Sequence, residues 1–302
     1  MATVEIENIT KSFGTQRAVD GVSFEVEKGE IFGLLGPNGA GKTTTIRILL
    51  DIFKPDSGRV AILGGPMTEA KKDYIGYLPE ERGLYQDITL DRCLTYLASL
   101  KGLAPAEAHR RINAYLEQFD LASSRNKKLK ELSKGMQQKA QLIVTLVHEP
   151  DLVIIDEPFS ALDPVNTQMV KDLLREQRSR GVTIVMCTHQ MHQVEELCDR
   201  LVLINQGKTV LYGRLEDIQR QYSGKDILVK ADRDLQTLAG IARVQPHNGS
   251  QRLTLAAGTS PQDILRSLVN LNVAVEQFEI AVPTLDEIFI QVVQGKQGSD
   301  NG

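Results

Sequence analysis

A glycine-rich stretch holds the residues of this chain best suited to binding phosphate. In chain order they are Gly36, Pro37, Asn38, Gly39, Ala40, Gly41, Lys42, Thr43 and Thr44. They fit the pattern G-x-x-x-x-G-K-T, in which glycines let backbone N–H groups turn toward phosphate oxygens. Lys42 offers a cation to the β- and γ-phosphates, and Thr43 offers a hydroxyl to Mg²⁺. The stretch therefore predicts a nucleoside triphosphate and Mg²⁺ as ligands.

Two adjacent carboxylates form the second candidate group. Asp156 and Glu157 follow an apolar run over residues 152–155, which is typical of a buried strand. A parallel sheet presents its ligand-binding residues at the carboxyl ends of its strands. Asp156 can hold Mg²⁺, directly or through water, and Glu157 can accept a proton from an attacking water. The alternative is that the two carboxylates only cap the strand.

A strand, a loop and a helix must position the phosphate-binding residues. An apolar run at 31–35 precedes the glycines, and a helical pattern at 44–50 follows them. Further buried strands are predicted at 74–78 and 182–187, and a helical insert at about 83–150. The expected fold class is α/β, a P-loop nucleotide-hydrolase core with a helical subdomain.

A small antiparallel sheet is expected beside this core. Alternating or short apolar runs at 4–7, 22–26 and 59–63 predict its strands. Turn-forming residues predict a turn at 11–14 and a hairpin turn at 27–30 that leads into the strand at Ile31.

The C-terminal part of the chain predicts a second, smaller domain. Residues 222–225 suggest a boundary, which gives a first domain at 1–222 and a second at 223–295. The second pattern is strand, helix, strand, strand, helix, strand, typical of a ferredoxin-like α+β module. Its first helix is expected at 235–238, and residues 284–287 form a capping box before the last helix. The polar tail at 296–302 is expected to be disordered.

Composition excludes several classes of protein. The chain has 302 residues, of which 41% are hydrophobic and 25% charged, with a net charge of −4. These values are ordinary for a globular protein and give no general attraction to nucleic acid or anionic membrane. No apolar run reaches the length of a transmembrane helix, and no signal peptide is visible. A role at a membrane would therefore need a partner.

Other polar residues allow alternatives. Ser133 suits the N-cap of a helix, whose N–H groups can bind an anion. The widely spaced Cys187, His189, His192 and Cys198 favour buried thiols over a zinc site, and the absence of a short-spaced cysteine pair fits a reducing cytosol. The basic residues at 125–130 favour a solvated or partner-facing loop over a nucleic-acid site, because the chain as a whole is acidic.

Taken together, the motifs resemble the ATP-binding-cassette (ABC) family. Its order is phosphate loop, signature, acidic strand, D-loop and switch histidine, which here are Gly36–Thr43, Leu132–Met136, Leu152–Glu157, Ser160–Asp163 and His189. The resemblance covers about residues 2–220. It implies a core of ABC type that binds ATP, with Phe13 stacking on adenine.

The resemblance also implies a shared site. Two such domains would pack head to tail, so that Ser133 and Gly135 serve the partner's ATP. Asp163 would couple the two sites, and His189 would contact the γ-phosphate and the water. Loss of the γ-phosphate would loosen the dimer and rotate the helical insert, which would move a membrane partner.

Three residues depart from the family's consensus. Lys134 and Met136 replace a glycine and a glutamine of the signature, and Glu80 aligns with the Q-loop glutamine, where its carboxylate can approach Mg²⁺. The stretch at 76–85 resembles the ATP-binding subunits of sodium-efflux and drug-efflux transporters. Residues 225–295 resemble the small C-terminal domain of that subgroup.

The expected function is an ATPase subunit that powers export through a separate membrane permease. We expect it on the cytoplasmic face of the membrane, paired with an identical or paralogous ABC subunit, and without a nucleic-acid partner. A soluble ABC protein of translation or DNA repair is the alternative, but such proteins usually have two cassettes or a long coiled-coil insert, and neither is visible here. An importer subunit is a third alternative, which the resemblance at 76–85 disfavours.

Overall fold

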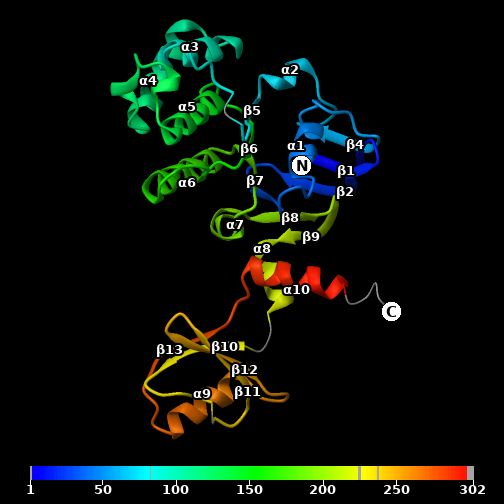
Figure 1. The fold of residues 1–302 in the computed structure, drawn as a ribbon, viewed down its shortest axis with the longest axis vertical. Helices are drawn as coiled ribbons and strands as arrows, with labels where there is room; N and C mark the ends of the chain where they lie inside the picture. Colours follow the sequence, from blue (N-terminus) through cyan, green and yellow to red (C-terminus); the bar gives the residue numbers. More distant parts are fainter. Residues whose placement is uncertain (1, 82, 224–225, 237, 298–302) are drawn as a thin grey trace. The chain divides into compact units, whose positions relative to one another are not determined.

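The protein forms two compact units. The computed structural model describes residues 2–81, 83–223, 226–236 and 238–297 (Figure 1). The units are Met1–Leu215 and Glu216–Gly302. The boundary falls after Leu215, so nearly all of helix α8 (Leu215–Tyr222) belongs to the second unit. The sequence predicted a boundary at 222–225, which placed this helix in the first domain.

A six-stranded sheet forms the centre of the first unit. In spatial order its strands are β5 (Ile75–Leu78), β6 (Leu152–Asp156), β7 (Thr183–Thr188), β3 (Ile31–Leu35), β8 (Arg200–Asn205) and β9 (Lys208–Arg214). All neighbours are parallel except the β8–β9 hairpin. Strands β3, β6 and β7 are buried at every position, as expected of parallel strands covered on both faces. The predicted α/β core is confirmed.

A second sheet shares a core with the first. Its antiparallel strands, in order, are β2 (Gln16–Glu27), β1 (Ala2–Phe13) and β4 (Ser57–Ile62). Helix α1 (Lys42–Leu49) contributes Ile46 and Leu49 to one apolar cluster with Phe24 of this sheet and Leu34 of β3. Burial of such side chains is the main driving force for folding. The cluster fixes the glycine loop, because the loop joins β3 directly to α1.

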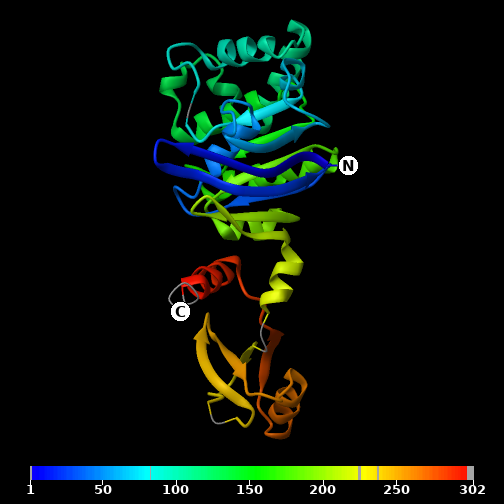
Figure 2. The same cartoon turned by 90° about the vertical axis from the view of Figure 1, so that its right-hand side faces the viewer.

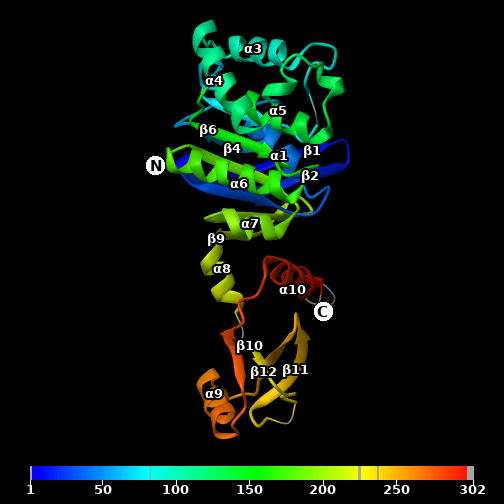
Figure 3. The same ribbon diagram turned by 90° about the vertical axis from the view of Figure 1, so that its left-hand side faces the viewer.

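Most of the remaining helices of this unit lie on the face of the main sheet that is turned away from the second sheet (Figures 2 and 3). Between β5 and β6 the chain forms the helical insert, with α3 (Leu90–Leu100), α4 (Pro105–Gln118), two 3₁₀ turns (Ala122–Ser124 and Leu129–Glu131) and α5 (Lys134–Leu146). The other helices are α2 (Glu69–Lys72), α6 (Pro164–Ser179) and α7 (Met191–Leu197). The predicted insert is thereby present. Among the described residues, no helix is both long and apolar enough to cross a membrane.

Two turn predictions in the first unit are wrong in part, although turn residues occur at 14–15 and 28–29. Residues 11–13 continue β1, and the chain reverses only at Gly14, where Phe13 pairs with Gln16. The prediction weighed turn-forming residue types and missed that pairing with β2 keeps this segment extended. Residues 27–30 do not form a hairpin, because β2 and β3 belong to different sheets.

The second unit contains a four-stranded antiparallel sheet. Its order is β11 (Ile241–His247), β12 (Ser250–Leu255), β10 (Asp226–Ala231) and β13 (Val275–Ile280), and its helices are α8, α9 (Pro261–Asn270) and α10 (Leu285–Gln297). This order fits the ferredoxin-like pattern that the sequence predicts. The capping box is present, since Thr284 and Glu287 each accept a hydrogen bond from the other's backbone N–H, both at 3.2 Å.

Two details of the second unit differ from the prediction. No helix forms among the described residues of 232–240, where Leu235 N–H donates to the Gln251 side chain at 3.0 Å instead of to a helical carbonyl. Helix α10 runs to Gln297, beyond the predicted start of the tail at 296. The rest of that tail, 298–302, lies outside the described residues.

His148, just beyond α5, is a buried titratable group. Its Nε2 lies 3.1 Å from the carbonyl oxygen of Ile75, while Nδ1 is buried without a partner. Burial is the main reason that the pKa of His148 is lowered to about 4, and the positive charge of Lys101 adds to it.

We therefore predict that acid weakens the fold through His148. Between pH 6.5 and about 4, His148 binds a proton in the unfolded chain but stays neutral in the folded chain. The free energy of unfolding therefore falls as the pH falls through this window. Urea unfolding across this range should show a shallower pH dependence for His148→Gln. His109→Gln, at an exposed position of α4, is the control, and equal pH dependence in all three proteins would contradict the prediction.

Candidate functional site

The glycine loop between β3 and α1 is bent by left-handed backbone and by close neighbours. Gly36, Gly39 and Gly41 have φ angles of 151°, 77° and 107°, values that suit glycine. A Cβ atom on Gly36 would lie 2.1 Å from the carbonyl oxygen of Ile204. One on Gly41 would lie 2.3 Å from that of Ala18. The loop keeps this shape only because both positions are glycine.

Lys42 lies at the start of α1 and folds back onto the loop. Its side chain is buried, and Nζ donates to the carbonyl oxygens of Gly36 at 2.7 Å and Pro37 at 3.2 Å. Gly41, the N-cap of α1, provides no side-chain cap, so the positive end of the helix faces the loop with its N–H groups. An ammonium group and free N–H donors at one helix end make an anion-binding site.

The loop lines a cavity of about 430 Å³. Its wall is formed by Phe13, Gln16, Ala18, Asn38, Gly39, Ala40, Gly41, Lys42, Thr43, Thr44, Glu80, Asp156 and Glu157. The structure thus brings together the aromatic residue, most of the loop and the carboxylates that the sequence singled out. Gly36 and Pro37 do not line the cavity, but their carbonyl oxygens accept the hydrogen bonds that hold Lys42.

Phe13 stands at the edge of this cavity. Its side chain is 46% exposed, although an aromatic ring is usually buried. It packs edge-on against Phe53, with ring centroids 5.4 Å apart and an angle of 67° between the planes. The ring therefore retains exposed surface where a flat ligand could stack, and its role with adenine stays a prediction.

A hydroxyl and a carboxylate, those of Thr43 and Asp156, approach each other in the wall of the cavity, which Glu80 and Glu157 also line. Thr43 Oγ1 lies 3.4 Å from Asp156 Oδ2, and Asp156 is only 2% exposed. Burial raises the pKa of Asp156, and the nearby charges of Glu80 and Glu157 raise it further. A divalent cation would offset this crowding of negative charge, and hydroxyl and carboxylate oxygens are the ligands that Mg²⁺ prefers. The donor set fits the metal.

The zinc alternative finds no support in the described part of the chain. No group of three or more His, Cys, Asp or Glu side chains is placed there to hold a metal ion. Cys187 and Cys198 are buried free thiols, and burial raises the pKa of both well above the usual thiol value. They behave as apolar core residues.

Glu157 is held in place by its backbone and its carboxylate. Its φ of 51° is unusual for a residue with a side chain, and its N–H donates to Cys187 O at 2.9 Å. The carboxylate accepts hydrogen bonds from Thr188 Oγ1 at 3.1 Å and from His189 N–H at 2.9 Å. His189 Nδ1 lies 2.7 Å from Glu157 Oε1, while the His189 side chain is 50% exposed. Half of the His189 side chain is thus open to solvent, although His189 is not among the residues that line the cavity.

Within one chain, the remaining predicted residues are not part of the cavity wall. Ser133 caps α5 by accepting from Met136 N–H at 3.2 Å, and Asp163 caps α6 by accepting from Asn166 N–H at 2.9 Å. A Cβ atom on Gly135 would lie 3.2 Å from the Ala161 carbonyl oxygen, so the signature packs against the D-loop. The capping role of Ser133 is confirmed, and its contact with a partner's nucleotide stays a prediction.

Sequence reasoning missed several residues of the site. Gln16 and Ala18 line the cavity from β2, and Thr188, which is fully buried, holds the Glu157 carboxylate. Gln138 of α5 donates to the Pro158 carbonyl oxygen at 3.2 Å. Of these residues, only Thr188 could have been predicted from the sequence, because it lies directly before His189 at the end of a predicted strand.

The arrangement of the loop and the carboxylates defines a class of protein. A glycine loop that joins a buried strand to a helix, with a carboxylate at the end of a second parallel strand, is the arrangement of P-loop nucleotide hydrolases. The cavity between them has the cation, the N–H donors and the metal-binding oxygens that a nucleoside triphosphate requires.

Comparison with known proteins identifies the family. Residues 19–160 match the family described as ABC transporter, and residues 213–293 match the one described as ATP-binding protein DrrA1-3-like, C-terminal domain. The chain is 40% identical to the uncharacterized ABC transporter ATP-binding protein YhaQ of Bacillus subtilis (strain 168), over 95% of this chain and 97% of that protein. The chain belongs to the ATP-binding subunits of ABC transporters, which hydrolyse ATP.

Two further relatives extend this result. The Nod factor export ATP-binding protein I of Paraburkholderia xenovorans (strain LB400) is 36% identical, over 75% of this chain and 76% of that protein. The solved structure of an ATP-binding subunit of an ABC transporter superposes with a TM-score of 0.69 at 33% identity, over 73% of this chain and 93% of that chain. ATP-binding subunits of this family dimerise and work with membrane permeases. The predicted family, and the presence of its C-terminal domain, are confirmed.

We predict that Lys42→Ala weakens nucleotide binding. The change removes a charged donor from the loop, and a hydrogen bond to a charged group is worth about 2 kcal/mol, or roughly a 30-fold loss of affinity. Titration with a fluorescent ATP analogue measures the effect. Lys54→Ala removes an exposed lysine that pairs with Asp51 just after the same helix, and it should leave the affinity unchanged. Unchanged affinity in Lys42→Ala would contradict the phosphate-loop assignment.

Proposed function

We propose that this protein is the ATP-hydrolysing subunit of an exporter, acting on a solute that passes through a separate membrane permease. The observation that carries the proposal is the pairing of an ABC core with a DrrA-like C-terminal domain, together with the likeness to a Nod factor export protein. The subunit would bind the permease at the cytoplasmic face of the membrane. The cargo would be an ion, a drug or another solute.

We further propose roles for the residues around the cavity. Lys42 and the N–H groups of the glycine loop bind the β- and γ-phosphates, while Phe13 supports the adenine ring. Thr43 and Asp156 would hold Mg²⁺, with Glu80 nearby, and the ion would supply charge that offsets the phosphates.

The chemical step in this proposal belongs to Glu157. Its carboxylate accepts a proton from the attacking water, and His189, bonded to the same carboxylate, orients the water and the γ-phosphate. The hydrogen bonds from Thr188 and the His189 backbone keep the carboxylate at the cavity before the nucleotide arrives. Such pre-orientation lowers the entropic cost of reaching the transition state.

A second ABC subunit, identical or paralogous, would complete each site. Ser133 and Gly135 lie at the N-terminal end of α5, with Ser133 exposed and outside its own chain's cavity. The N–H groups at that helix end suit a phosphate of the partner's ATP. Asp163, near Gly135 through the D-loop, would then report the state of one site to the other.

Affinity purification from native membranes tests the transporter assignment. Co-purification with an integral membrane protein is the expected result. Recovery with ribosomes or DNA-repair proteins, and without a membrane protein, would replace it with the soluble alternative. Transport assays with the recovered permease would then distinguish export from import.

We predict that Glu157→Gln retains ATP binding and loses turnover. The amide has nearly the same shape but cannot accept the proton, and loss of a general base typically costs a factor of about 100 to 10,000 in rate. Phosphate release under saturating ATP measures turnover. Glu117→Gln, at an exposed position of α4, is the control that should keep normal activity. Hydrolysis by Glu157→Gln at near the normal rate would refute the general-base role.

We predict that Ser133→Arg prevents the ATP-dependent dimer. The long cationic side chain would occupy the space where the partner's nucleotide has to meet the end of α5. Size-exclusion chromatography of the Glu157→Gln background with ATP measures dimerisation. Ser179→Arg makes the same chemical change at an exposed position near the C-terminus of α6 and should leave the dimer intact. Dimers of undiminished stability in the Ser133→Arg protein would reject the shared site.

A further inference from the structure

A stripe of polar side chains on α5 faces the core of the first unit. The spacing of three and four residues places them on one side of the helix, and they are Gln138, Gln141, Thr145 and, just past the helix end, His148. Gln138, Gln141 and His148 lie 3.2, 3.3 and 3.1 Å from the backbone carbonyl oxygens of Pro158, Glu81 and Ile75, in that order. Thr145 Oγ1 donates to Gln141 O within the helix at 2.9 Å and lies 3.4 Å from Tyr77 O. The stripe thus joins the insert to the edge of the main sheet.

The first member of the stripe contacts the turn that carries Glu157. Gln138 is only 2% exposed, and its Nε2 lies 3.2 Å from the carbonyl oxygen of Pro158 and 3.5 Å from that of Glu157. The left-handed backbone of Glu157 is costly for a residue with a Cβ, so surrounding contacts must maintain it. The Gln138 amide is one of those contacts, and it approaches from the helix that begins at Ser133.

The second member contacts the loop that carries Glu80. Gln141 is 3% exposed, and its Nε2 donates to the carbonyl oxygen of the adjacent Glu81. The other end of the same amide, Oε1, is buried without a partner among the described atoms. A buried polar group left unpaired is unfavourable, so a purely structural role would be better served by an apolar side chain. The amide is explained if its bond to this loop has a function.

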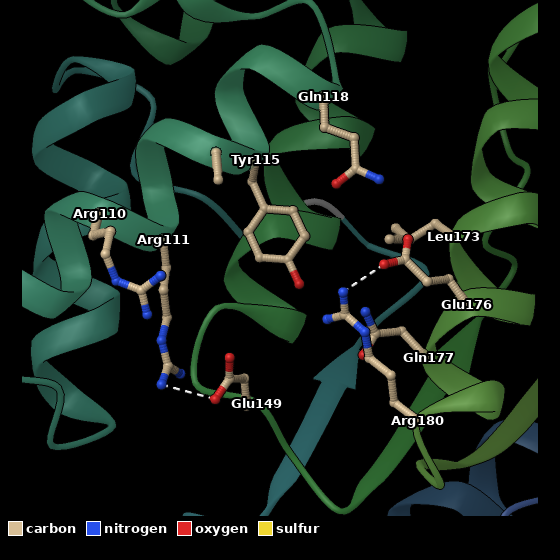
Figure 4. A pocket seen from close by; sticks show the side chains of 10 residues that line it. Arg110, Arg111, Tyr115, Gln118, Glu149, Leu173, Glu176, Gln177 and Arg180 are labelled. Atoms are coloured by element: carbon tan, nitrogen blue, oxygen red, sulfur yellow. Dashed lines mark hydrogen bonds and ion pairs between the residues drawn. The ribbon is translucent and has the colours of Figure 1, made fainter.

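The insert is less tightly joined to the core on its other side. A cavity of about 280 Å³ lies between α4 and α6, lined by Tyr115 and several charged residues (Figure 4). Its ion pairs do not cross the cavity. Arg111 pairs with Glu149 at 2.8 Å on one side, and Arg180 pairs with Glu176 at 2.5 Å on the other. Across the described residues of α4 and α6, no hydrogen bond or ion pair links the two helices.

Lys101, just beyond α3, also joins the insert to the core, but it donates to the carbonyl oxygens of Lys72 and Ile75, at the other end of β5 from Glu80. The side-chain bonds to the turn that carries Glu157 and the loop that carries Glu80 come from α5.

We propose that Gln138 and Gln141 are positioning residues for ATP hydrolysis. The hydrogen bond of Gln138 makes the position of the turn that carries Glu157 depend on the position of α5. The hydrogen bond of Gln141 does the same for the loop that carries Glu80. A helix that engages the partner's nucleotide at Ser133 thereby aligns the groups that act on its own chain's nucleotide. This inference rests on the proposed roles of Glu157, Glu80 and Ser133.

Replacement of Gln138 by Met tests the first link, because Met is close in size and flexible but cannot donate a hydrogen bond. We expect kcat for Mg-ATP to fall at least tenfold, while the Kd for a fluorescent ATP analogue changes less than twofold. Lys139→Met is the matched control. It removes a buried donor from the next position of the helix, where Nζ bonds to Phe119 O at 3.0 Å inside the insert, and it should leave kcat within twofold.

The outcomes of this comparison are distinct. A normal kcat in Gln138→Met, or an equal fall of kcat in Lys139→Met, would overturn the inference. Thermal unfolding of both variants shows whether their losses of stability are comparable. If Gln138→Met does not fold, Gln138→Asn takes its place with the same expectation, because its amide is too short to reach the turn.

Replacement of Gln141 by Met tests the second link through the metal. If the loop at Glu80 is displaced, the Mg²⁺ concentration for half-maximal hydrolysis should rise at least threefold, with kcat at saturating Mg²⁺ within twofold. An unchanged Mg²⁺ dependence would overturn this half of the inference. Glu157→Gln is measured in parallel: if that variant hydrolyses ATP normally, the general-base proposal itself fails, whereas an inactive Glu157→Gln beside a normal Gln138→Met rejects only the positioning role.

Discussion

The register of three parallel strands is the constraint on which the site depends. Hydrogen bonding aligns Leu35 of β3 with Thr188 of β7, and Cys187 of β7 with Asp156 of β6. The ends of the strands therefore meet at one edge, and the loop that follows Leu35 lies beside the carboxylates that follow β6. A shift of one residue would turn alternate side chains to the opposite face and separate these groups. Catalytic geometry here is a consequence of sheet geometry.

Burial on both faces protects that register. The second sheet and α1 cover one side in a continuous apolar cluster, with Phe24 stacked on Phe32 at a centroid distance of 5.2 Å. Helices cover the other side (Figure 3). Because the strands are fully enclosed, their polar backbone groups have few alternatives to the observed pairing. The helical insert contacts this core through α5, which combines buried apolar residues such as Leu142 and Ile143 with the polar stripe.

The sequence was sufficient for features set by local chemistry. The glycine loop, the caps at Ser133 and Thr284 and the carboxylates after β6 were all predicted where the structure has them, because each depends on residue types at fixed spacing. Long-range features were not predictable in the same way. Residues 11–13 became strand through pairing with β2, and the contacts of Thr188 and Gln138 with the Glu157 segment depend on how distant elements pack.

The folded-back position of Lys42 has a consequence for ligand exchange. Its ammonium group is already desolvated and already bonded to two carbonyl oxygens of the loop. If Lys42 binds phosphate as proposed, the phosphate substitutes for existing acceptors. It does not have to recruit a freely moving side chain from solvent, whose ordering would carry an entropic cost. The affinity then reflects the difference in free energy between Lys42 bonded to the loop and Lys42 bonded to phosphate. When a ligand leaves, the ammonium group can return to these two carbonyl oxygens, so Lys42 is not left without a hydrogen-bond partner.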